Sequence, residues 1–141
     1  DGQAPEGFYF GTSQSLRPAT RHHLGLDIGY PNAYDAQHNY TGSDLMIHGG
    51  VSSAGAFALA PKDMEDVYAL TEASIEAGQK IVRINVFPFR MTDGRMDKIW
   101  NKPPQWVDFW VNLKEGYDFF ENVGVPPDAV AESGRYVFRI D

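Results

Sequence analysis

The residues best placed to do chemistry lie in one short stretch, residues 48–59, which reads HGGVSSAGAFAL. His48 follows an apolar run and precedes two glycines. A histidine at the end of a strand, next to glycine backbone that a substrate can approach closely, suits a general base. The same pattern fits a histidine that caps a strand before a glycine turn, so spacing alone leaves both interpretations open.

Ser53, two residues before Gly55, is the most evident nucleophile in this stretch. A pair of Ser53 with His48 is conceivable. However, the context is not G-x-S-x-G, and we expect no strand that leads directly into a helix there. A turn serine that donates to the backbone is the favoured interpretation. Ala56 stands where a nucleophile would be expected, and it carries no reactive atom.

A metal or cofactor site is not predicted. The histidines of the chain are His22, His23, His38 and His48. The side chains of the adjacent pair diverge in an extended chain, and Asp27 and Asp35 add no recognised ligand spacing. The chain has no cysteine, which excludes disulfides and Cys-ligated zinc or iron–sulfur sites.

Arg90 is a further candidate, because it follows a predicted strand in the segment FPFRM. Its guanidinium could clamp the carboxylate of a ligand. It could equally pair with the acidic helix predicted earlier in the chain, and the sequence does not separate these alternatives.

The elements that must position these residues form a mixed pattern. Short apolar strands are predicted at residues 8–10, 24–28, 45–47, 81–87 and 135–140. Amphipathic helices are predicted at 61–77, with Pro61 at the first helical position, and after Pro103-Pro104. Residues 11–43 are predicted to form a long loop that contains only the strand at 24–28, and such a loop is usually functional. The fold class is therefore α+β, with a mainly β core of mixed sheets and two flanking helices.

The chain of 141 residues has the size of a single domain, residues 1–141. It opens with a turn that runs into a strand, so we expect preceding strands to be missing or to come from a partner chain. The net charge of −7 argues against nucleic acid or an anionic membrane surface as a partner. No apolar run reaches the roughly 18 residues of a transmembrane helix.

Several blocks of the sequence together resemble one family. They are DGQAPEGFY, IGYPNAYDAQHNYTG, LMIHGGVSSAGAFAL, VFPFRMT and FWVNLKEGYDFFE. The chain is similar to the YkuD-type L,D-transpeptidases, and within them to the YafK/DpaA-like branch of periplasmic murein amidases. The resemblance covers residues 1 to about 139 and implies an exported, periplasmic protein whose signal peptide is absent from this chain.

The resemblance assigns roles to residues by their position in the motif. His48 matches the general base, Ser53 and Gly55 match the S-x-G before the nucleophile, and Ala56 matches the nucleophilic cysteine. The backbone at Gly55 would help to form an oxyanion hole. The expected substrate-binding residues are Gly49, Tyr34, Asn32, Phe57 and Arg90. The loop at 29–42 would control access of the acceptor, although its tyrosines fit ordinary loop packing equally well.

The implied reaction is cysteine acyl transfer at meso-diaminopimelate of peptidoglycan stem peptides. A thiolate forms a thioester, which an amine (transpeptidation) or water (hydrolysis) resolves. An alanine at position 56 cannot do this, so the chain is expected to be an inactive Cys-to-Ala variant. The alternative is a natural pseudoenzyme that binds a peptidoglycan peptide or a wall-linked protein. A cysteine at 56 would lie shortly before the predicted helix, whose N-terminus would lower its pKa.

Overall fold

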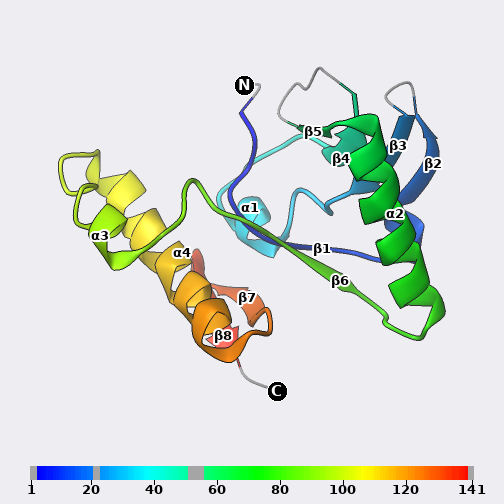
Figure 1. The fold of residues 1–141 in the computed structure, drawn as a ribbon. Coiled ribbons are helices and arrows are strands. Elements are labelled where there is room, and N and C mark those ends of the chain that lie inside the picture. The colour runs from blue at the N-terminus through cyan, green and yellow to red at the C-terminus, as the bar shows by residue number, and fades with distance from the viewer. Residues whose placement is uncertain (1–2, 21–22, 51–55, 140–141) are drawn as a thin grey trace.

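A computed structural model describes residues 3–20, 23–50 and 56–139 of the chain (Figure 1). A four-stranded sheet with one long helix lies on one side of the molecule, and a second long helix with a hairpin lies on the other. A two-stranded ribbon runs between them. This arrangement confirms the predicted α+β class with mixed sheets.

The connecting ribbon consists of β1 (Gly7–Gly11) and β6 (Val82–Val86), which pair antiparallel with Tyr9 opposite Ile84. Both strands were predicted from their apolar content. β1 is buried except at Phe10. Gly7 is required there, because a Cβ at this position would stand 2.3 Å from the Tyr136 hydroxyl.

The four-stranded sheet has the order β2 (Leu16–Thr20), β3 (His23–Asp27), β4 (Met46–Gly49) and β5 (Phe57–Leu59). β4 and β5 are parallel, and the other neighbours are antiparallel. The helix α2 (Pro61–Glu76) packs on β3 and β4 and buries Met64 completely. Its predicted bounds are confirmed to within one residue.

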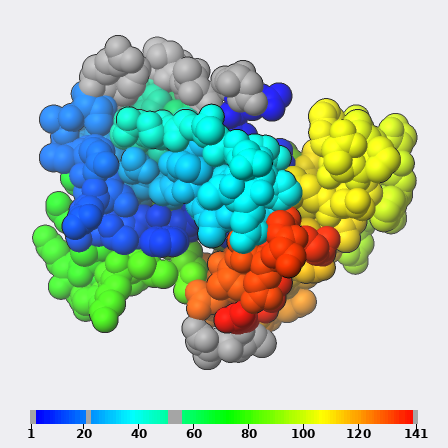
Figure 2. Space-filling model, turned by 180° about the vertical axis from the view of Figure 1, so that it is seen from behind, coloured from blue at the N-terminus to red at the C-terminus, as the bar shows by residue number. Residues whose placement is uncertain are grey.

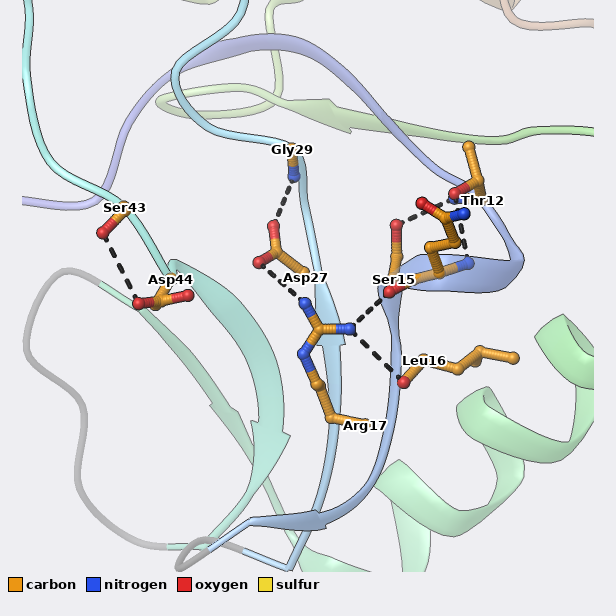
Figure 3. A network of polar contacts seen from close by, with 9 residues as sticks. Thr12, Ser15, Leu16, Arg17, Asp27, Gly29, Ser43 and Asp44 are labelled. Atoms are coloured by element: carbon orange, nitrogen blue, oxygen red, sulfur yellow. Dashed lines mark hydrogen bonds and ion pairs between the residues drawn. The ribbon is translucent and has the colours of Figure 1, made fainter.

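The prediction of a long loop at residues 11–43 is wrong. Besides β3, this segment holds a 3-10 turn η1 (Ser13–Ser15), strand β2 and a short helix α1 (Ala33–Gln37). β2 lacks apolar alternation because it lies at the sheet edge with its residues at least partly exposed. It is held by its pairing with β3 and by the Arg17 guanidinium, which reaches Asp27 of β3 at 3.7 Å (Figure 3).

The second long helix, α4 (Pro104–Val123), ends at Gly124, which adopts the left-handed conformation at φ 78°. It packs against β8 (Arg135–Arg139) of a hairpin whose other strand is β7 (Asp128–Glu132). The short helix α3 (Asp93–Met96) precedes it. The two predicted helices correspond to α2 and α4, and the prediction missed the short α1 and α3, as well as β5 and β7.

The main apolar core lies between β1, α1, α4 and β8. Its buried members are Phe8, Tyr34, Met91, Met96, Ile99, Val107, Leu113 and Tyr136. Phe8 contacts Tyr136 and Phe138 edge to face, with ring centroids 5.1 and 4.9 Å apart. No helix in the described part of the chain is long and apolar enough to cross a membrane.

Candidate active site and aromatic cavity

His48 lies in β4, between two neighbouring strands. It is opposite Gly25 of β3 on one side and opposite Ala58 of β5 on the other. The side chain is 2% exposed, and its Nδ1 lies 3.3 Å from the Gly49 carbonyl oxygen. The predicted position at the end of an apolar strand is confirmed. The catalytic role assigned to it stays a prediction.

Ala56 immediately precedes β5 and is half-buried. In the parallel register, Ile47 pairs with Phe57 and His48 with Ala58. The pairing begins at Phe57, so Ala56 lies in a bend one residue before the ladder. Position 56 is therefore two residues along the chain from Ala58, the partner of His48.

The expected influence of a helix N-terminus on position 56 finds no support in this arrangement. β5 stands between Ala56 and α2, and Ala60 is the N-cap of that helix. An extended chain rises about 3.3 Å per residue, so the four steps from 56 to 60 cover roughly 13 Å. The field of a helix end acts mainly within its first turn. His48 is therefore the nearer group for activating a thiol at position 56.

Two of the predicted site residues, Ser53 and Gly55, lie outside the described residues. Phe57 begins β5 and is half-buried. Arg90 is exposed in the segment between β6 and α3. Their roles stay predictions.

Gly49 follows His48 and is buried at a tight contact between β4, the β2–β3 hairpin and α2. A Cβ at this position would stand 3.1 Å from Cδ2 of His23 and 3.4 Å from Cβ of Met64. His23 adopts φ 70°, and its Nε2 lies 3.2 Å from Glu65 Oε1 on α2. His23 and Gly49 are far apart in the sequence, and only the antiparallel pairing of β3 with β4 brings them together.

Asn32 was predicted to bind substrate, and in the structure its side chain makes hydrogen bonds that stabilise the fold. Its side chain caps α1 by accepting from the Asp35 amide, and it donates to the Phe8 carbonyl at 2.9 Å and to the Tyr136 hydroxyl at 2.8 Å. These bonds hold α1 against the core. Tyr34 is 6% exposed and stacks on Tyr136, with centroids 4.5 Å apart and planes 9° from parallel.

A cavity of about 790 Å³ lies where the N-terminal segment, the α1 region and the start of α4 meet. Figure 2 shows the α1 region, in cyan, beside the beginning of α4, in yellow. Its lining residues are Gln3, Ala4, Pro5, Glu6, Tyr30, Tyr34, Asp35, Asn39, Tyr40, Thr41, Trp106, Phe109 and Trp110. Neither His48 nor Ala56 is among them, so the cavity is a feature distinct from the predicted catalytic residues.

The loop that forms one wall of the cavity is fixed at its base. Asp27 Oδ1 accepts from the Gly29 amide at 2.8 Å, and the same carboxylate pairs with Arg17 (Figure 3). Gly29 has φ 81°, and a Cβ there would stand 2.8 Å from the Phe10 carbonyl oxygen. The loop therefore leaves β3 in a defined direction and presents its tyrosines to the cavity.

Two carboxyl groups of the cavity lie in environments that disfavour charge. Asp35 is 3% exposed, and its Oδ2 accepts from the Tyr9 hydroxyl at 2.9 Å and from the Asn32 amide at 3.0 Å. Burial raises the pKa of Asp35, and these hydrogen bonds only partly oppose the shift. Burial also raises the pKa of Glu6, whose Oε2 accepts from Trp110 Nε1 at 3.0 Å.

The described residues contain no group of three or more His, Cys, Asp or Glu side chains that could hold a metal ion. The expectation that the protein binds no metal stays a prediction. The chemistry available on β4 beside β5 is that of one buried imidazole, His48.

Comparison with known proteins gives two relatives, from Escherichia coli K12 and from Escherichia coli O157:H7. Both are named, provisionally, as the L,D-transpeptidase YafK. Each is 39% identical over 137 residues, which is 97% of this chain and 55% of the relative. The chain thus spans about half the length of the curated relatives it matches, and no family model matches it. The predicted resemblance is confirmed: over 97% of its length, this chain is similar to proteins named as the L,D-transpeptidase YafK.

Proposed function

We propose that residues 1–141 form one L,D-transpeptidase catalytic domain that acts on peptidoglycan by cysteine acyl transfer, with position 56 as the site of the nucleophile. The observation that supports this proposal is the parallel pairing of β4 with β5, because His48 lies opposite Ala58, two residues after position 56. The identity to proteins named as L,D-transpeptidases supports the reaction class. The substrate would be the diaminopimelate residue of a stem peptide, reached in the periplasm.

With a cysteine at position 56, the proton of the thiol passes to the His48 imidazole as sulfur attacks the carbonyl carbon. Backbone N–H groups near Gly55 would stabilise the oxyanion of the tetrahedral intermediate. The intermediate collapses to a thioester, and the leaving amine takes the proton from the imidazolium. Water then yields a carboxylic acid, or an acceptor amine yields a new amide, and the thiol is regenerated.

The chain as it stands cannot complete the first step, because the methyl group of Ala56 is no nucleophile. We therefore propose that it is an inactive form of a cysteine enzyme. The decisive experiment introduces Ala56→Cys and incubates the variant with diaminopimelate-containing muropeptides. Intact-protein mass spectrometry should detect an acyl adduct, and product analysis should detect a cleaved or exchanged amide.

Ala69→Cys is the matched control, because it puts a thiol at an exposed position in the middle of α2, on no strand that pairs with His48. It should form no adduct. If Ala56→Cys also forms neither adduct nor product, the acyl-transfer proposal is refuted.

A second candidate function is a binding module that holds a stem peptide or a wall-linked protein without cutting it. The alanine at position 56 is the observation in its favour. Binding of muropeptides to the chain as it stands, combined with an inert Ala56→Cys variant, would support it. A natural gene that encodes cysteine at position 56 would remove its basis.

A further inference from the structure

The proposed reaction uses none of the side chains that line the cavity between the N-terminal segment, the α1 region and α4. Six of its thirteen lining residues are aromatic and two are carboxylic acids, and none of the lysines, arginines and histidines that the structure describes lines it. The volume of about 790 Å³ falls within the range of small-molecule sites, roughly 300–1,000 Å³. Large aromatic walls with few convergent polar groups are typical of such sites.

The aromatic walls come from two elements. α4 contributes Trp106, which is 52% exposed, and Trp110, whose ring lies 6.2 Å from that of Trp106. The loop around α1 contributes Tyr40, which is 51% exposed, and Tyr30. Aromatic faces that remain open to a cavity attract cations, tryptophan most strongly.

The two carboxyl groups differ in what they can offer a ligand. Asp35 is buried, and its Oδ2 already accepts from two donors, so it contributes mainly negative potential. Glu6 is half-buried, and Trp110 donates to its Oε2. This bond orients the carboxylate beside the indole ring and leaves Oε1 without a hydrogen-bond partner among the described residues.

We propose that this cavity binds an alkylammonium group, such as the side-chain amine of a lysine-like residue, with Glu6 as its ion-pair partner and Trp106 and Trp110 as its aromatic cage. Charge complementarity supports this occupant, because the described residues of the lining carry two acidic groups and no basic one. The proposal does not rest on the proposed acyl transfer. His48 and Ala56 do not line the cavity, and binding can be measured with alanine at position 56.

The test uses isothermal titration calorimetry on the chain as it stands. Nα-acetyl-lysine N-methylamide is the probe, and Nα-acetyl-norleucine N-methylamide is its uncharged counterpart of nearly the same shape. The lysine probe should bind at least about tenfold more tightly, since ion pairing and cation–π contact both need the ammonium. Its affinity should fall as salt is raised.

Two variants assign the binding to the cavity. Glu6→Gln keeps an oxygen acceptor for Trp110 and removes the charge, and Trp106→Ala removes one wall; each should weaken lysine-probe binding about tenfold. The controls are Glu121→Gln and Trp100→Ala, both exposed and outside the cavity, and they should leave binding unchanged. Circular dichroism confirms that each variant is folded.

Three results would overturn the proposal. They are equal affinity for the lysine and norleucine probes, no binding of either probe at roughly 10 mM, and tight binding of a neutral N-acetylglucosamine oligosaccharide without binding of the lysine probe. The Ala56→Cys assay with muropeptides is independent of all three results, so failure of one proposal is distinguishable from failure of the other.

Discussion

His48 of β4 and Ala58 of β5 occupy paired positions in a parallel ladder. This pairing fixes the distance between the two strands, and position 56 lies one residue before β5 begins. The helix that follows is too far along the chain to supply the main charge stabilisation at position 56. The activation of a thiol at this site should consequently depend on the imidazole.

The first prediction concerns the pH profile of that thiol. In the Ala56→Cys variant, alkylation by iodoacetamide should have its midpoint at least about one pH unit below the ordinary thiol value of about 8.5. Adding His48→Asn should return the midpoint to the ordinary value. The exposed thiol of Ala69→Cys on α2 is the reference. Identical midpoints with and without His48 would contradict the assigned base.

Asn112 gives the second prediction. It is 2% exposed on α4, and its amide donates to the Tyr136 carbonyl at 2.9 Å and accepts from the Tyr136 amide at 2.8 Å. Asn112→Leu leaves both backbone groups of β8 unpaired, and it should lower the free energy of unfolding by about 2 kcal/mol or more. Urea denaturation measures this loss.

The exposed Asn101 serves as its control. Asn101→Leu should change the unfolding free energy by less than about 0.5 kcal/mol. An equally small effect of Asn112→Leu would mean that β8 does not depend on this side-chain clamp.

The elements that sequence could predict are those whose signals are local. α2 shows a helical apolar period between Pro61 and Gly78, and β6 alternates apolar residues. β2 and β7 could not be recognised in this way. LRPAT has no apolar face, and the core-facing side of DAVAE consists of two alanines only, so both strands depend on their partner strands. α1 carried a readable signal that was overlooked, the capping box between Asn32 and Asp35.

The same difference between local signals and tertiary contacts applies to the candidate site. His48 was predicted correctly at a strand end because the signal lies within four adjacent residues. The aromatic cavity was not predicted, because its walls come from residues 3–6, 30–41 and 106–110, which only the tertiary fold brings together. The proximity of His23 to Gly49 likewise depends on strand pairing rather than on sequence spacing.

Gly116 gives the third prediction. It lies inside α4, where a Cβ would stand 2.4 Å from the Phe8 ring and 2.6 Å from the Phe138 ring. Gly116→Ala should therefore destabilise the fold by about 1–3 kcal/mol through overpacking, although alanine is the better helix former. The control is Gly94→Ala in α3, where no atom lies within 4 Å of the added methyl group. Thermal unfolding should distinguish the two, and a stabilised Gly116→Ala variant would contradict the packing described for α4 and β1.

The last prediction concerns the dependence of stability on pH. Burial raises the pKa of Asp35 in the folded state above its unfolded value of about 3.9. In the window between these two values the folded state binds more protons than the unfolded state. The contribution of this group to stability therefore falls as pH rises from about 3.9 through the folded pKa.

Asp35→Asn keeps an oxygen acceptor for Tyr9 and removes the titration. Relative to the unmodified chain, this variant should gain stability as pH rises through that window, and the gain should level off above it. Urea denaturation at a series of pH values measures the difference. Asp66→Asn, at an exposed position of α2, should show no such trend. A relative stability of Asp35→Asn that falls with rising pH would show that hydrogen bonding, rather than burial, dominates at Asp35.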